Sequence, residues 1–184
     1  MTNDIKRQTL AILVDNESGV LSQISRLFSR KGYNIESLAV GATENPAISR
    51  ITIEVIADDE QVALLANQLR KLFPVHSVKL LTPETSIRRE LVLLKVRTPD
   101  SAARNEVIQI ANIFRANIID VAIGSITLSV IGAEQKTDAI EKILAEYGIL
   151  ELVRTGVVAL ERGQETIKDQ TKEKGEFDYG KNVL

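Results

Sequence analysis

The 184-residue chain has no cysteine, no tryptophan and only one histidine. Without cysteine it can form no disulfide bonds, no thiolate nucleophile and no metal site with sulfur ligands. No apolar run approaches the length of about 20 residues that a membrane-spanning helix needs, and residues 1–8 are polar rather than signal-like. These absences predict a cytoplasmic protein with no membrane partner. A plastid stromal protein whose transit peptide had been removed would look the same.

Aromatic residues are also scarce, and the chain carries no net positive charge. Aromatics make up 4% of the chain, and the formal net charge is −2. A nucleic-acid-binding α+β domain would instead present stacking aromatics on its sheet and a basic surface. We therefore expect no nucleic-acid partner.

Motifs that carry catalysis are missing as well. The sequence contains no Walker-type phosphate loop, no dinucleotide-binding glycine fingerprint and no metal-ligand spacing. The pair Ser18-Gly19 lies outside any G-x-S-x-G nucleophile elbow, and His76 falls in a predicted strand, where a lone histidine is usually structural. Asp58 and Asp59 stand at a predicted helix start, where negative charge is stabilising. The chain is predicted to have no catalytic residues, no metal and no cofactor of its own.

What the sequence does contain is a hydrophobic pattern in the order βαββαβ. In the first half, apolar runs predict short strands, and apolar residues at helical spacing follow Ser18 and Asp58. We expect Ser18 to be the N-cap of the first helix and Gly32 to end it. This order is the split βαβ, or ferredoxin-like, arrangement. The predicted strands are residues 9–14, 34–41, 48–57 and 75–81.

The second half repeats the same order. Its predicted strands are residues 91–96, 117–123, 126–130 and 149–160. One predicted helix follows the turn that begins at Thr98, and another carries the apolar residues Ala139, Ile140, Ile143 and Leu144. An internal repeat of this length indicates two domains of one class. The predicted fold is therefore α+β, with two ferredoxin-like βαββαβ sandwiches. The predicted domains are residues 1–82 and 89–162, joined by a linker at 83–88 and followed by a polar, charged tail at 163–184.

Two strands are apolar on both faces. Residues 10–14 and 91–94 show this pattern, whereas a ferredoxin-like sheet carries helices on one face only. An uncovered apolar face is poorly tolerated on a soluble monomer. We expect the sister domain or a second copy of the chain to cover it, and we predict a homodimer.

The turn from the first strand into the first helix is the strongest candidate for a binding site. Its glycine, Gly19, lets a ligand approach the backbone, and the N–H groups that open the helix favour a carboxylate. Asn16 would add a side-chain contact. An ordinary capped turn is the alternative interpretation. The corresponding turn in the second repeat, residues 98–101, has no glycine and contains Pro99, which lacks a donor, so only the first domain is expected to bind.

Several stretches of the chain resemble the small, regulatory subunit of acetolactate synthase, also called acetohydroxyacid synthase. The first two stretches are the most specific, and the resemblance spans about residues 8–163. The stretches are residues 16–21 (NESGVL), 27–38 (LFSRKGYNIESL), 49–53 (SRITI), 89–91 (REL), 113–115 (IFR), 118–121 (IIDV) and 154–158 (RTGVV).

The resemblance implies an amino-acid-sensing ACT domain in the first half and a family-specific ferredoxin-like domain in the second. It implies a non-catalytic subunit that activates the catalytic (large) subunit and confers feedback inhibition by branched-chain amino acids, usually valine. Thiamine diphosphate, magnesium and FAD would then belong to the catalytic subunit. The effector would lie between two protomers, against residues from both. The implied effector-binding residues are Asn16, Glu17, Ser18, Gly19, Val20, Leu21, Asn34 and Ile35.

Another class of function is a free-standing amino-acid-binding regulator of transcription or of another enzyme. A transcriptional regulator would need a DNA-reading module, and the sequence shows no basic helix-turn-helix pattern. The resemblance leaves the preferred branched-chain amino acid open, because Gly41 stands where some relatives would carry a larger residue.

Overall fold

The computed structural model describes residues 5–170, which divide into two compact units. Within the described range, the first unit contains residues up to Glu36, Val40–Ser86 and residues from Leu160 onward. The second contains Ser37–Ala39 and Ile87–Ala159. No described helix is long and apolar enough to cross a membrane.

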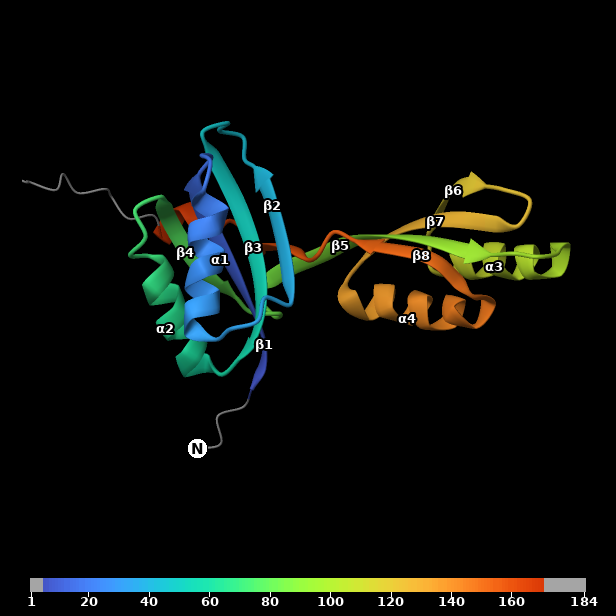
Figure 1. The fold of residues 1–184 in the computed structure, drawn as a ribbon, viewed down its shortest axis with the longest axis horizontal. Coiled ribbons are helices and arrows are strands. Elements are labelled where there is room, and N and C mark those ends of the chain that lie inside the picture. The colour runs from blue at the N-terminus through green and yellow to red at the C-terminus, as the bar shows by residue number, and fades with distance from the viewer. Residues whose placement is uncertain (1–4, 171–184) are drawn as a thin grey trace, which may run out of the picture. The chain divides into compact units, whose positions relative to one another are not determined.

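The first unit is a four-stranded antiparallel sheet with two helices on one face (Figure 1). Its sheet order is β2-β3-β1-β4, so β1 is central and β2 is an edge strand. Side chains of β1 and β3 that face the helices, such as Leu10, Ile12 and Ile53, are completely buried. The elements in chain order are β1 (Lys6–Asp15), α1 (Val20–Lys31), β2 (Ser37–Ala42), β3 (Ile48–Ala57), α2 (Asp59–Leu69) and β4 (Val75–Leu81).

The second unit repeats this architecture. Its sheet order is β6-β7-β5-β8, with β9 also pairing with β5. Its core joins alternate residues of β5 and β7, such as Val92 and Leu128, to Val107 of α3 and Ile140 of α4. The elements are β5 (Ser86–Arg97), α3 (Ser101–Ile113), β6 (Asn117–Val121), β7 (Ser125–Gly132), α4 (Glu134–Leu144), the 3-10 turn η1 (Ala145–Tyr147), β8 (Ile149–Arg154) and β9 (Val158–Glu161). The 3-10 turn η2 (Ile167–Gln170) follows β9 and belongs to the first unit. The prediction of two ferredoxin-like α+β sandwiches is confirmed.

Several element boundaries differ from the sequence prediction, and three of the differences change how the chain is divided into elements. Strand β5 begins at Ser86, inside the predicted linker 83–88. The predicted strand 149–160 is two strands, because Gly156 between β8 and β9 has a left-handed φ of 77°. Strand β2 begins at Ser37 rather than at residue 34, because the residues after α1 first close the helix: Gly32 and Tyr33 donate to the carbonyls of Ser29 and Phe28.

The face of the first sheet opposite the helices is covered in part by the last residue of β9 and the residues that follow it. Ser77 Oγ of β4 donates to the Ile167 carbonyl at 2.8 Å, and Lys79 Nζ lies 2.6 Å from Glu161 Oε2. The Ile167 side chain is 6% exposed. We call residues 161–168 the C-terminal strap. The sequence assigned residues 163–184 to a polar tail and expected the sister domain or a second copy to cover this face. Here the chain's own strap contributes the cover, and residues 171–184 lie outside the described range.

The corresponding face of the second sheet remains apolar and exposed. Leu91 pairs with Ile131, and Leu93 pairs with Val153 across the sheet. The two leucines are half-buried, whereas Ile131 is 60% and Val153 51% exposed. The face without helices is therefore partly covered by the strap in the first unit, whereas in the second unit it is apolar and exposed.

Candidate functional site

The turn that leads from β1 into α1, residues 15–19, is called here the α1 entry loop. Helix α1 has Gly19 as its N-cap residue, with φ 88° and ψ −12°, and no side chain caps it. The prediction that Ser18 is the N-cap is wrong. Because glycine has no Cβ, it adopts the left-handed conformation readily, so the chain turns at residue 19 and Ser18 lies one position outside the helix.

The first turn of α1 consequently presents backbone donors that no side chain satisfies. The first helical hydrogen bond runs from Gln23 N to Gly19 O at 3.0 Å, so Leu21 and Ser22 lie in the stretch whose N–H groups have no acceptor within a helix. The first turn of α1 contains no acidic residue. Open donors at the positive end of a helix dipole favour an anion such as a carboxylate.

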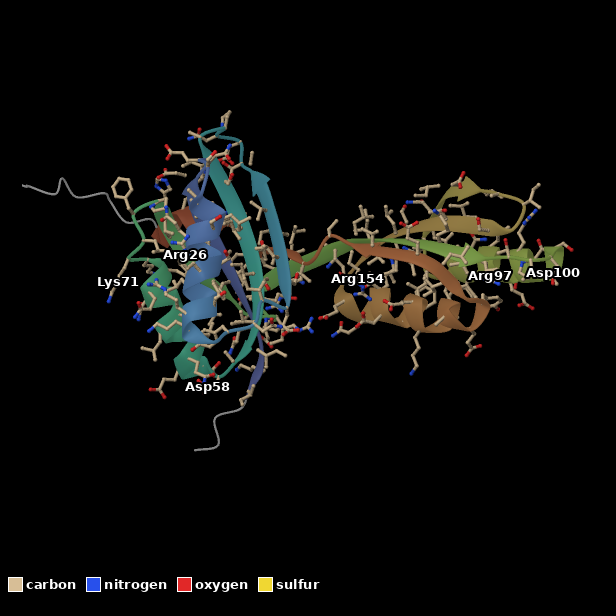
Figure 2. The ribbon with its side chains drawn as sticks, in the orientation of Figure 1. Arg26, Asp58, Lys71, Arg97, Asp100 and Arg154 are labelled. Atoms are coloured by element: carbon tan, nitrogen blue, oxygen red, sulfur yellow. The ribbon has the colours of Figure 1, made fainter. Side chains whose placement is uncertain are left out.

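The other helix starts are closed by side chains or carry a negative charge. Asp58 and Gln61 form a reciprocal capping box at α2, with Gln61 N donating to Asp58 Oδ1 at 2.7 Å. Asp100 accepts from Ala103 N at 2.8 Å at the start of α3 (Figure 2). Helix α4 has no side-chain cap, but Glu134 occupies its first turn. Among the four α-helices in the described range, α1 is the one with neither feature.

Asn16 anchors the entry loop to the β2–β3 hairpin. Its backbone N–H donates to Ala47 O at 2.8 Å, and its Nδ2 donates to Pro46 O at 2.8 Å. Its Oδ1 accepts from Ser49 Oγ at 3.0 Å. The side chain thus holds the loop in place within its own chain. Contact between Asn16 and a ligand stays a prediction.

The remaining predicted site residues occupy different surroundings. Glu17, Ser18 and Gly19 are exposed. Val20 is only 5% exposed, so its side chain belongs to the core and its backbone alone is available to a ligand. Leu21 is 42% exposed and supplies an apolar surface beside the open donors.

Asn34 and Ile35 lie at the opposite end of α1. The helix has 12 residues, which span about 18 Å at 1.5 Å per residue. Asn34 Nδ2 donates to Glu36 Oε1 at 2.6 Å. One chain therefore does not bring Asn34 and Ile35 to the entry loop, and a site built from both groups needs a second copy of the chain.

Two side-chain networks were not predicted from the sequence. In the first, His76 of β4 contacts Asp15, the first residue of the entry loop, with Nε2 2.5 Å from Oδ1. No local sequence pattern predicts this pair, because the two residues are 61 positions apart. The sequence suggested only a structural role for His76.

The second network surrounds Arg154 in the second unit (Figure 2). Its guanidinium donates to Glu90 Oε1 at 2.8 Å, to Asp138 Oδ1 at 2.6 Å and to Glu141 Oε2 at 2.5 Å. Burial lowers the pKa of Arg154, but the hydrogen bonds to Glu141 and Asp138 and the charges of Glu90 and Glu141 outweigh that effect and raise the pKa overall.

A hollow of about 500 Å³ lies beside this network, lined by Asp138, Glu141, Lys142 and Arg154. Because three carboxylates already engage the guanidinium, we interpret the network as a structural clamp that joins β5, α4 and β8. The described residues contain no group of three or more His, Cys, Asp or Glu side chains arranged to hold a metal ion.

Comparison with known protein families accounts for most of the chain. Residues 10–77 match the family described as the AHAS small subunit-like ACT domain, where AHAS is acetohydroxyacid synthase. Residues 89–163 match the family described as the small subunit of acetolactate synthase. The two matches coincide with the two sandwiches.

The similarity to individual relatives covers most of this chain and most of each relative. A protein of Mycolicibacterium smegmatis named acetolactate synthase small subunit is 42% identical over 163 residues, which are 89% of this chain and 95% of the relative. One of Aquifex aeolicus with the same name is 43% identical over 92% of this chain and 88% of its own. The crystal structure of the acetolactate synthase small subunit from Thermotoga maritima superimposes with a TM-score of 0.81 at 35% identity, over 88% of this chain and 100% of that one.

Proposed function

The chain belongs to the acetolactate synthase small subunit family, and from this premise we propose that it is the subunit through which a branched-chain amino acid, valine first among them, controls the catalytic subunit. It would activate the catalytic subunit and make that subunit sensitive to feedback inhibition. The thiamine diphosphate, magnesium and FAD used by the holoenzyme would be held by the catalytic subunit.

The observation that carries the proposal is the uncapped start of α1. Its open N–H groups suit the carboxylate of an amino acid, and each hydrogen bond to a charged group contributes about 1.5–3 kcal/mol. The exposed side chain of Leu21 offers an aliphatic wall for a small apolar side chain. A free branched-chain amino acid has both of these parts.

A homodimer paired through the β2 edge would complete the site. Strand β2 is the edge of its sheet, and Val40 on it is 49% exposed. If β2 of two copies paired antiparallel about the middle of the strand, the residues preceding one β2 would lie beside the hairpin that follows the other. That hairpin, through Ala47 and Pro46, holds Asn16. Asn34 and Ile35 of a second copy would thereby approach the entry loop.

In this dimer Asn34 would serve the ammonium group of the effector, and Ile35 would add to the aliphatic wall. Effector binding would favour one arrangement of the dimer over another. Allosteric couplings of this kind amount to about 1–3 kcal/mol, which is enough to change the activity of the catalytic subunit several-fold.

The direct test is to add the purified chain to an isolated acetolactate synthase catalytic subunit and to measure turnover with and without valine. We expect the chain to raise turnover and valine to reduce the stimulated rate. Leucine and isoleucine, assayed in parallel, would rank the effectors. Absence of both stimulation and any amino-acid effect would contradict the proposal and favour a free-standing regulator.

The dimer has its own test. Sedimentation at micromolar concentration should give the mass of two chains, and a charged residue on the β2 edge, Val40→Lys, should shift the protein toward the monomer. The same variant should lose valine binding, because the second half of the site would no longer be present. A monomeric wild-type chain that still binds valine would contradict the two-protomer site.

A further inference from the structure

His76 occupies an irregular position in the sheet of the first unit. In the ladder between β1 and β4, Leu13 pairs with Ser77 and Val14 pairs with Val75. His76 is the extra residue between these two pairs, so β4 carries a β-bulge there. Such bulges locally bend a strand and redirect a side chain.

The redirected side chain meets the entry loop. His76 Nε2 lies 2.5 Å from Asp15 Oδ1, and because a carboxylate can only accept, the imidazole nitrogen donates. Both side chains are mostly buried, at 19% and 21% exposure. The backbone supports the same junction, since Asp15 N donates to Pro74 O at 2.9 Å.

The start of the entry loop is therefore fixed from two sides. On one side, the segment Pro74–His76 holds Asp15. On the other, the β2–β3 hairpin holds the next residue, Asn16, through its backbone and both ends of its side chain. Only three residues separate this double attachment from Val20, where α1 begins. A shift of Asp15 would be transmitted directly to the open N–H groups of the helix.

We propose that His76 is a positioning residue of the effector site: by holding Asp15 it keeps the entry loop in the conformation that directs the N–H groups of Leu21 and Ser22 at the effector carboxylate. The histidine does not touch the effector itself. This inference rests on the function proposed above, because it concerns the site at which the amino acid is bound.

Two substitutions at one position test the role. His76→Leu fills similar space but cannot donate to Asp15, whereas His76→Gln retains an amide donor of similar reach. Valine binding to the full chain is measured by titration calorimetry. We expect His76→Leu to weaken binding about tenfold or more, equivalent to about 1.4 kcal/mol, and His76→Gln to restore most of the affinity.

A double-mutant cycle separates positioning from a general loss of packing. If His76 acts through Asp15, His76→Leu should have little further effect on affinity in an Asp15→Leu background. Backbone amide resonances of Leu21 and Ser22 should shift in His76→Leu before any valine is added. Equal affinity of wild type and His76→Leu, or additive losses in the cycle, would overturn the inference. A wild-type chain that binds no branched-chain amino acid would instead refute the proposed function.

Discussion

The two sandwiches share one chain order but use the turn before their first helix in opposite ways. In the second unit, Asp100 closes the start of α3 by accepting from Ala103 N. In the first, a left-handed Gly19 starts α1 without any side-chain cap. A side-chain cap stabilises a helix by about 1 kcal/mol relative to alanine at the N-cap, whereas glycine there costs only about a few tenths of a kcal/mol relative to such a cap. The first unit has no side-chain cap at this position, and the donors at the start of α1 remain available to the proposed effector.

The two sheets also differ on the face that bears no helices. In the first unit the C-terminal strap lies on this face, with Ile167 buried and its carbonyl bonded to Ser77. In the second unit the same face keeps Ile131 and Val153 exposed. The helix-free face of the first sheet is thus partly covered by the C-terminal strap, and the described residues provide no equivalent cover for the second sheet.

The largest effect is expected from placing a charge at the open helix start. Gly19→Asp puts a carboxylate where the effector carboxylate would bind, and like charges in contact cost several kcal/mol, so valine affinity should fall by a factor of at least about 100 and feedback inhibition should be lost. Stimulation of the catalytic subunit should be largely retained. Calorimetry and turnover measure the two effects.

The matched control is Gly19→Asn, which has nearly the same shape without the charge. Asparagine also tolerates a left-handed backbone, and a Cβ at residue 19 would meet no atom within 4 Å. We expect its affinity loss to be much smaller. If both variants lost affinity equally, the site would depend on the glycine backbone rather than on charge.

The second prediction concerns the covered sheet face. Ile167→Asp places an unpaired carboxylate in a buried apolar position, which should destabilise the first unit by about 2–3 kcal/mol. The loss of stability is measured by thermal unfolding of the full chain, monitored through the NMR resonances of each unit. The comparison variant is Val153→Asp on the exposed face of the second sheet, expected to change stability by less than about 0.5 kcal/mol. A large loss for Val153→Asp would mean that this face is covered in the assembled protein.

A smaller effect is expected at the closed helix start. Asp100→Ala removes the N-cap of α3 and should lower stability by about 1 kcal/mol, while valine inhibition stays unchanged. Denaturant unfolding and the turnover assay test the two statements. A changed response to valine would show that the second unit takes part in sensing, contrary to the comparison of the two turns.

The smallest effect concerns the ion pair between Lys168 of the strap and Glu44 of the β2–β3 hairpin. The hydrogen bond from Lys168 lowers the pKa of the Glu44 carboxyl. Because the pKa is lowered in the folded state, the pair's contribution is present above the unfolded pKa and disappears as the pH falls through the lowered value. Both groups are solvent-exposed, so Glu44→Gln should barely change the melting temperature at about pH 7. The difference from wild type should vanish once the pH lies below the lowered pKa.

Much of the fold could be predicted because its signals are local. The alternating pattern in residues 48–57 predicted both ends of β3 correctly. The strand predicted at 75–81, directly after Pro74, also has the observed bounds of β4. Gly32 was correctly expected to end α1, since a left-handed glycine after basic residues is a local signature. The cap was misplaced at Ser18 because Ser18 and Gly19 are both good cap residues, so the local pattern alone did not decide between them.

The features of the candidate site likewise divide into those set by neighbouring residues and those set by contacts between distant residues. The sequence by itself determined two βαββαβ repeats, the membership of the family and the location of an anion-favouring turn before residue 20, because hydrophobic period, glycine placement and family motifs are properties of neighbouring residues. Only the tertiary structure decided that Asn16 is tied to Pro46, that His76 holds Asp15, and that the C-terminal strap covers part of the first sheet. These contacts join residues about 30 to 90 positions apart, and their partners are chosen by strand register and by a bulge, which no local pattern records.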